Sequence, residues 1–271
     1  MPEMLPEQQP KDRFSADQAR EAVLAAGRAL LRERGLQPGF GNVTFNDAIS
    51  RSGVPRGSAY RLWSLSDSRK PQDAFWDDLL VTTIASGSTN ETETTHAVVD
   101  DYLSAQHDLV NNGTPADKAH ILRETIRLGA EANIKSLAQS PEWYLQMASL
   151  ASRSLVPHPN PAIEEAHQEG NKVTTTRFID LYRELGDLFG LRLRSNYTWE
   201  QFSTMAASAA CGVSVHWMHN PWVVNIQRAT GPDGQMKKWS GFGVLLEGLV
   251  FLCFEPIPEA DNAADITIWV T

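Results

Sequence analysis

Residues 44–63 constrain the fold of this 271-residue chain more than any other stretch. Thr44 is a good helix N-cap, and the apolar Ile49 follows at a spacing that turns it toward a core. Gly53 stands where a left-handed residue ends a helix, and Pro55 fits the first turn of the next helix, where no amide hydrogen is needed. The stretch therefore predicts two short helices joined by a tight turn, the helix-turn-helix arrangement.

The second of these helices carries side chains suited to DNA. Arg56 and Arg61 can pair with phosphates or with the edge of a guanine, and Tyr60 can donate its phenol to a phosphate oxygen. Small residues at 57–59 let the backbone approach a duplex closely. The alternative is a plain helical hairpin with a solvated basic face.

The run from Asp47 to Trp63 resembles the DNA-binding domain of TetR-family transcriptional regulators. That family shows Asp-Ile-Ala, then Gly-Val-Ser or Gly-Val-Pro, a Lys or Arg, a Gly, a small pair, a Tyr and a closing aromatic residue. The corresponding residues here are Asp47-Ala48-Ile49, Gly53-Val54-Pro55, Arg56, Gly57, Ser58-Ala59, Tyr60 and Trp63. The order of Ala48 and Ile49 departs from the family, and the segments 35–42 and 64–69 are longer than usual.

The resemblance covers residues 15–85, and beyond them it rests on helical pattern and length. It implies an all-α fold with a flexible arm at 1–14, a three-helix DNA-binding domain with its linker helix at 15–85, and a larger helical effector-binding and dimerisation domain at 86–271. Lys70 would face the DNA backbone, although a solvated lysine is the simple alternative. The residues expected at the DNA interface are Thr44, Asn46, Arg56, Gly57, Ser58, Ala59, Tyr60, Arg61 and Lys70.

Charge is distributed unevenly along the chain. The net charge is −9, yet the first 85 residues carry equal numbers of basic and acidic side chains, so the excess negative charge lies in residues 86–271. A basic hairpin on an acidic body suits a site-specific DNA-binding protein, because the body disfavours other contacts with phosphate. No apolar run is long enough to span a membrane, and the start of the chain has no apolar leader.

Helical periodicity continues through the rest of the chain. Ser15 is expected to cap a first helix, Pro71 to begin the linker helix, and the polar segment 86–93 to form a loop between domains. The tail 266–270 is expected to be a strand or a packed extended end. Further helices are expected near 95–111, 115–138, 141–155, 161–190, 198–219 and 238–254.

The chain shows no catalytic or cofactor motif, so neither an enzyme nor a cofactor is predicted. Cys211 and Cys253 lie too far apart in sequence for a metal motif or a disulfide framework, and a reducing cytoplasm is the simplest setting. His216 and His219 have a spacing that could hold a metal, but a surface or interface pair is favoured. No metal site is therefore predicted.

Aromatic and Met residues at helical spacing in the body are mostly expected to form its core. The family resemblance also implies an apolar cavity for a small apolar or aromatic effector. The residues expected to line it are Trp143, Tyr144, Met147, Phe178 and Tyr182.

Two classes of function follow. The first is a repressor that binds a palindromic operator as a homodimer and is released by its effector. The apolar helices near 198–219 and 238–254 would form the shared surface, the alternative being ordinary core helices. The second class is a helical enzyme or lipid-binding protein that keeps the hairpin without binding DNA.

Overall fold

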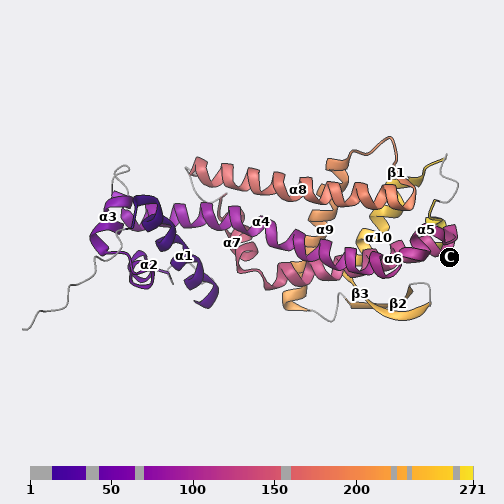
Figure 1. Cartoon of the computed structure of the whole chain (residues 1–271), viewed down its shortest axis with the longest axis horizontal. Helices are drawn as coiled ribbons and strands as arrows, with labels where there is room; N and C mark the ends of the chain where they lie inside the picture. The colour runs from indigo at the N-terminus through magenta and orange to yellow at the C-terminus, as the bar shows by residue number, and fades with distance from the viewer. Residues whose placement is uncertain are drawn as a thin grey trace, which may run out of the picture. The chain divides into compact units, whose positions relative to one another are not determined.

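A computed structural model describes residues 14–34, 43–64, 70–153, 160–220, 225–230, 234–258 and 263–270, and most of them are helical (Figure 1). The predicted predominance of helix is therefore confirmed. The contacts divide the chain into two compact units. Unit 1 comprises Met1–Ile84 and Tyr144–Ala166, and unit 2 comprises Ala85–Trp143 and His167–Thr271. The sequence did not indicate that 144–166 would join the first unit.

Unit 1 is built on an aromatic cluster that joins three helices. Phe45 lies 5.1 Å from both Trp63 and Phe75, and Trp63 lies 5.9 Å from Phe75, measured between ring centroids. All three side chains are almost completely buried. The helices of this unit are α1 (Ala16–Arg34), α2 (Phe45–Ser52), α3 (Arg56–Ser64), the start of α4 (Pro71–Ala105), most of α7 (Pro141–Arg153) and the start of α8 (Pro161–Phe189).

Side-chain caps begin the helices where the sequence placed them. Ser15 and Gln18 exchange hydrogen bonds at the start of α1. The hydroxyls of Thr44, Thr114 and Thr198 each accept the backbone N–H three residues further on, at 3.1–3.2 Å. Each of these bonds satisfies a backbone donor that the first turn of a helix leaves unpaired.

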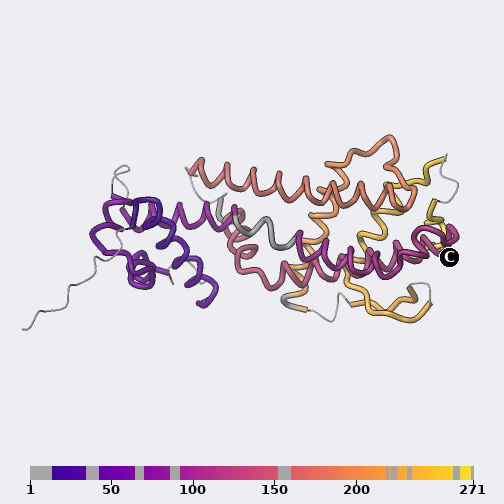
Figure 2. Tube along the Cα trace, viewed as in Figure 1, coloured from indigo at the N-terminus to yellow at the C-terminus, as the bar shows by residue number. Residues whose placement is uncertain are grey.

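Unit 2 adds a β-hairpin to a core of packed helices. Helices α6, α9 and α10 pack against one another, and the antiparallel hairpin of β2 and β3 lies beside α6 and α10 (Figures 1 and 2). A second short antiparallel pair joins β1 to β4. The elements not yet bounded are α5 (His107–Asn112), α6 (Pro115–Gln139), β1 (Leu191–Leu193), α9 (Trp199–His219), β2 (Asn225–Thr230), β3 (Gln235–Ser240), α10 (Gly241–Cys253), β4 (Phe254–Pro256) and the 3-10 helix η1 (Ile266–Val270).

Four local predictions are wrong. The segment 86–93 is not a loop but part of α4, because weak local propensity yields to a helix whose Ile84 and Val99 are buried on either side of it. The hairpin was not predicted, and 238–240 are strand rather than helix. The tail 266–270 forms a 3-10 helix. Pro55 was expected in the first turn of its helix, but α3 begins at Arg56. Pro55 lies directly before the helix, and its carbonyl accepts the first amide bonds of α3.

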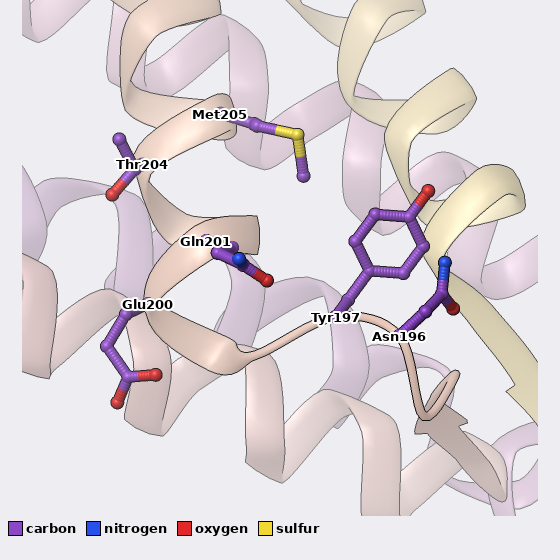
Figure 3. A pocket seen from close by; sticks show the side chains of 6 residues that line it. All are labelled: Asn196, Tyr197, Glu200, Gln201, Thr204 and Met205. Atoms are coloured by element: carbon purple, nitrogen blue, oxygen red, sulfur yellow. The ribbon is translucent and has the colours of Figure 1, made fainter.

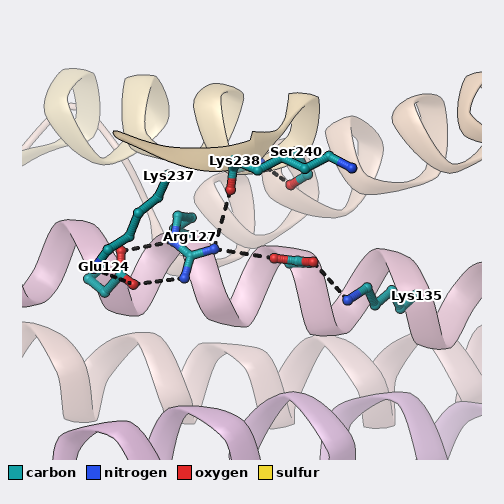
Figure 4. Close-up of polar contacts among 8 residues, drawn as sticks. Glu124, Arg127, Lys135, Lys237, Lys238 and Ser240 are labelled. Carbon is teal, nitrogen blue, oxygen red and sulfur yellow. Dashed lines mark hydrogen bonds and ion pairs between the residues drawn. The ribbon is translucent and has the colours of Figure 1, made fainter. Parts of the chain in front are cut away.

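Buried ion pairs attach the hairpin to the helices of unit 2. On α6, Glu124 accepts hydrogen bonds from Arg127 and from Lys237 of β3, at 2.7 and 3.3 Å (Figure 4). Arg127 also donates to the backbone carbonyl of Lys238 at 3.2 Å (Figure 4). On α10, the buried Glu247 accepts hydrogen bonds from both Arg123 and Arg228. The hairpin is therefore held by charged groups.

Trp239 of β3 is enclosed by the same charged groups. The guanidinium carbons of Arg123 and Arg228 lie 5.8 and 5.3 Å from the centre of its fully buried indole. Both arginines are also paired with Glu247. One carboxylate therefore balances two cations that cover the same ring.

Replacing Glu247 by Ala is expected to lower the free energy of unfolding by about 3–5 kcal/mol, because breaking a buried pair leaves its partner charge uncompensated. The measurement is urea denaturation followed by circular dichroism. Glu131→Ala is the matched control, since the Glu131 side chain is 32% exposed and its pairs should contribute at most about 1 kcal/mol. Equal losses in the two variants would contradict this account of the hairpin.

Candidate nucleic-acid interface

Helix α3 presents one face to its own unit and the other to solvent. Gly53 adopts a left-handed conformation, with φ of 71°, and ends α2 as the sequence predicted. Ala59 and Trp63 then point into the core. Arg56, Gly57, Ser58 and Arg61 are exposed. The prediction for Ala59 needs correction, because its side chain is completely buried and packs inside the unit, so it cannot contact DNA.

A polar patch joins the exposed face of α3 to the start of α2. The hydroxyl of Tyr60 donates to Oδ1 of Asn46 at 3.1 Å. The guanidinium of Arg56 lies over the Tyr60 ring, 5.2 Å from its centre. In this structure the Tyr60 hydroxyl hydrogen is thus engaged with Asn46 rather than free for a phosphate. Asn46 and Tyr60, both predicted as site residues, lie together with Arg56.

Carboxylates neutralise the basic side chains that flank this patch. Both terminal nitrogens of Arg51 donate to the carboxylate of Glu33, at 2.5 and 2.6 Å. Arg34 donates to Asp47 at 2.7 Å. This bond, together with bonds from Thr44, holds the pKa of the Asp47 carboxyl below its usual value.

The basic residues of α3 stand apart from these ion pairs. Among the described residues, no carboxylate forms an ion pair with Arg56, Arg61 or Lys70. Lys70 is exposed immediately before α4, where its backbone carbonyl accepts the first amide bonds of that helix. Thr44 is exposed, and its hydroxyl accepts the backbone N–H of Asp47 as the N-cap of α2. Among the described residues around the patch, the basic side chains without a carboxylate partner therefore lie on α3 and at the start of α4.

Helix α4 supplies contacts that the sequence did not reveal. The side-chain oxygen of Gln72 accepts the backbone N–H of Phe45 at 2.7 Å. Oδ2 of Asp78 accepts both the indole N–H of Trp63 and the guanidinium of Arg20, each at 2.7 Å. These acceptors orient α2, α3 and α1 against one helix. They lie 15 to 58 residues from their donors, so local sequence patterns carry no signal for them.

The five predicted effector-pocket residues are divided between the units. Tyr144 and Met147 belong to unit 1, whereas Trp143, Phe178 and Tyr182 belong to unit 2. Within unit 2, Phe178 stacks on Tyr182 at 6.0 Å, and burial raises the pKa of the Tyr182 hydroxyl. Tyr182 also meets the buried Phe202 edge-on at 5.0 Å, so the three rings form one packed aromatic cluster.

Unit 2 also has an open depression at the start of α9 (Figure 3). Its volume is about 490 Å³, and it contains none of the five predicted pocket residues. The effector site therefore stays a prediction. The residues that line the depression are Asn196, Tyr197, Glu200, Gln201, Thr204 and Met205.

The part of the chain that the structure describes contains no group of three or more His, Cys, Asp and Glu side chains able to hold a metal. His216 is exposed, and the side chain of His219 lies outside the described residues. Within the same residues, every helix is too short or too polar to cross a bilayer. Comparisons with protein-family models, curated proteins and solved structures found no match to this chain.

Replacing Gly53 by Ala is expected to destabilise unit 1 by about 1–2 kcal/mol, because a left-handed conformation is unfavourable for a residue with a Cβ. No atom lies within 4 Å of the added carbon, so the cost comes from the backbone alone. Gly57→Ala is the control, since the space there is equally open and the residue is helical. This variant should gain up to about 1 kcal/mol, as measured by chemical denaturation. The same sign of change at both positions would contradict the assigned turn.

Proposed function

We propose that the protein is a sequence-specific DNA-binding transcriptional regulator that reads DNA with α3. The observation that supports this most directly is the exposed face of that helix. Arg56 and Arg61 project from it without a carboxylate partner among the described residues, while the neighbouring Arg51 is neutralised by Glu33. A short helix with exposed arginines and small residues fits a major groove. The resemblance to TetR-family regulators supports the same function.

In this proposal the helices around α3 form the DNA-binding domain, and the body binds a small apolar or aromatic effector that releases the operator. Repression follows from the family resemblance. A cytoplasmic setting is proposed because the spacing of Cys211 and Cys253 indicates no disulfide framework. The aromatic content of the body is the support for the class of effector. The proposal assigns no enzymatic activity. A helical enzyme or lipid-binding protein remains the alternative if the chain does not bind DNA.

Replacing Arg56 or Arg61 by Ala is expected to weaken operator binding by about 1–3 kcal/mol for a residue that contacts a guanine, and to relax specificity at that base. The operator is first selected from a pool of random duplexes, and affinities are then measured with excess competitor DNA at two salt concentrations. The salt series separates base contacts from phosphate contacts.

Arg51→Ala is the matched control for this series. It removes the same charge from the adjacent helix, but from a guanidinium already paired with Glu33. It should leave operator affinity within about threefold of the original protein, since an exposed ion pair contributes little. If the Arg56 and Arg61 variants bind the operator as well as the Arg51 variant does, α3 is not the DNA-reading helix.

Operator binding by this proposal requires two copies of the chain, because a single short helix buries too little surface for specific affinity. The surface of α10 supports this. This helix is apolar on nearly all sides, but within one chain Leu245, Leu252 and Phe251 are 49%, 55% and 38% exposed. The opposite face, with Phe242 and Leu246, packs into the unit. We propose that a second copy covers the exposed face.

The original chain is expected to be a dimer in light scattering at micromolar concentration, with twice the mass of 30.0 kDa. Leu245→Glu should convert it to a monomer, because the charge is buried without a partner in such an interface. Leu109→Glu is the control, since Leu109 lies on α5 and is 37% exposed. A monomeric original chain, or a dimeric Leu245 variant, contradicts this surface.

A further inference from the structure

Asn160 connects the start of α8 to α4 within unit 1. Its side-chain oxygen accepts the N–H of Ala162 at 3.0 Å, and its backbone carbonyl accepts the N–H of Ile163, which makes it the cap of α8. Its side-chain nitrogen donates to Oδ2 of Asp77 on α4 at 2.7 Å. Serine, threonine and aspartate also cap helices. An aspartate has no side-chain donor for Asp77, and a serine or threonine hydroxyl lies on a shorter side chain than the asparagine amide that donates to it.

Asp77 is followed immediately by the residue that fixes α3. Asp78 accepts the indole N–H of Trp63 and the guanidinium of Arg20 on one oxygen. Consecutive residues of an α-helix project about 100° apart, so the two carboxylates face different neighbours while they move as one rigid body. A change in the pull of the α8 cap on Asp77 therefore acts on the same turn of α4 that carries the Asp78 carboxylate bound to Trp63.

We propose that Asp77 and Asp78 form a positioning pair through which the first turn of α8 sets the orientation of α3. α8 begins in unit 1 and continues into unit 2, so the pair connects the DNA-reading helix to a helix of the proposed effector-binding body. The consequence for DNA rests on the proposed function. The connection between Asn160 and Trp63 does not, and it can be measured without DNA.

The test uses variants that keep an oxygen at position 160 to cap α8 but change the side-chain group that donates to Asp77. Asn160→Asp retains a capping oxygen but places a second carboxylate against Asp77. Asp77→Asn in the same chain restores an amide donor with its direction reversed. Asn160→Ser keeps a capping hydroxyl and removes the amide donor without adding charge. Asn171→Asp adds the same charge to an exposed position of α8 and is the control.

The first measurement is the indole N–H resonance of Trp63 in the ¹⁵N-labelled protein without DNA, assigned as the one absent in Trp63→Phe. Asn160→Asp and Asn160→Ser should shift this resonance, the Asp77→Asn/Asn160→Asp double variant should return it toward its original position, and Asn171→Asp should leave it unchanged. A cap that only stabilises α8 would change the melting temperature and leave the Trp63 resonance in place.

The second measurement is affinity for the selected operator. Asn160→Asp should lower it by about fivefold or more, the lower end of typical coupling between sites, and the double variant should recover it. An unchanged Trp63 resonance in folded Asn160→Asp and Asn160→Ser overturns the positioning pair, even when the original chain binds its operator. Absence of operator binding in the original chain contradicts the proposed function. The positioning pair is still supported in that case if the Trp63 indole resonance shifts in the two Asn160 variants and returns in the double variant.

Discussion

The packing of Phe45, Trp63 and Phe75 is the interaction on which the placement of α3 depends. These rings draw α2, α3 and α4 to one point, with centroids 5.1 to 5.9 Å apart, and so decide which side of α3 turns inward. Apolar burial is strong but has little direction, and an aromatic core alone would tolerate some rotation of α3. The indole N–H of Trp63 removes that freedom, because its bond to Asp78 fixes the ring and the helix that carries it. Burial of the aromatic rings thus packs α3 against α2 and α4, and the hydrogen bond from Trp63 to Asp78 sets the angle of α3.

Unit 2 is held together by a different balance. Glu124 and Glu247 are buried and lie under a hairpin whose inward face carries Arg228, Lys237 and Trp239. Buried charges cost desolvation energy and are tolerated only when their partners are well placed. The hairpin must therefore hold Arg228 and Lys237 in one position relative to the two glutamates. One face of α10 is buried within the unit, and Glu247 and Leu246 lie on that face. The other face, with Leu245 and Leu252, is left for a partner in the proposed dimer.

Local chemistry explains which parts of the fold could be predicted. Caps such as Thr44 and the left-handed Gly53 depend on neighbours within a few residues, so the sequence shows them directly. The segment 86–93 resembles a loop in composition, but it is helical because the flanking turns of α4 are packed. The hairpin depends on charged partners more than 100 residues away on α6, and no periodicity reveals them. In the candidate site, the sequence supplied the basic residues of α3 but could not show that Ala59 faces inward or that Glu33 removes Arg51 from the available charge.

That selective neutralisation has a consequence for how such a surface would discriminate between sequences. Affinity from phosphate contacts grows with the number of cations presented, and it carries no sequence information. Arg51 and Arg34 lie close enough in sequence to α3 to enlarge a general phosphate-binding surface, but Glu33 and Asp47 bind them. Around this patch, the described basic side chains without a carboxylate partner are Arg56 and Arg61 of α3 and Lys70, on a chain with a net charge of −9. In the proposed function, such a surface gains little from arbitrary DNA, and affinity for an operator comes from the few side chains that α3 presents. Their orientation then matters more than their number, so the hydrogen bond from the Trp63 indole to Asp78 of α4, which fixes the angle of α3, is important to the proposed function.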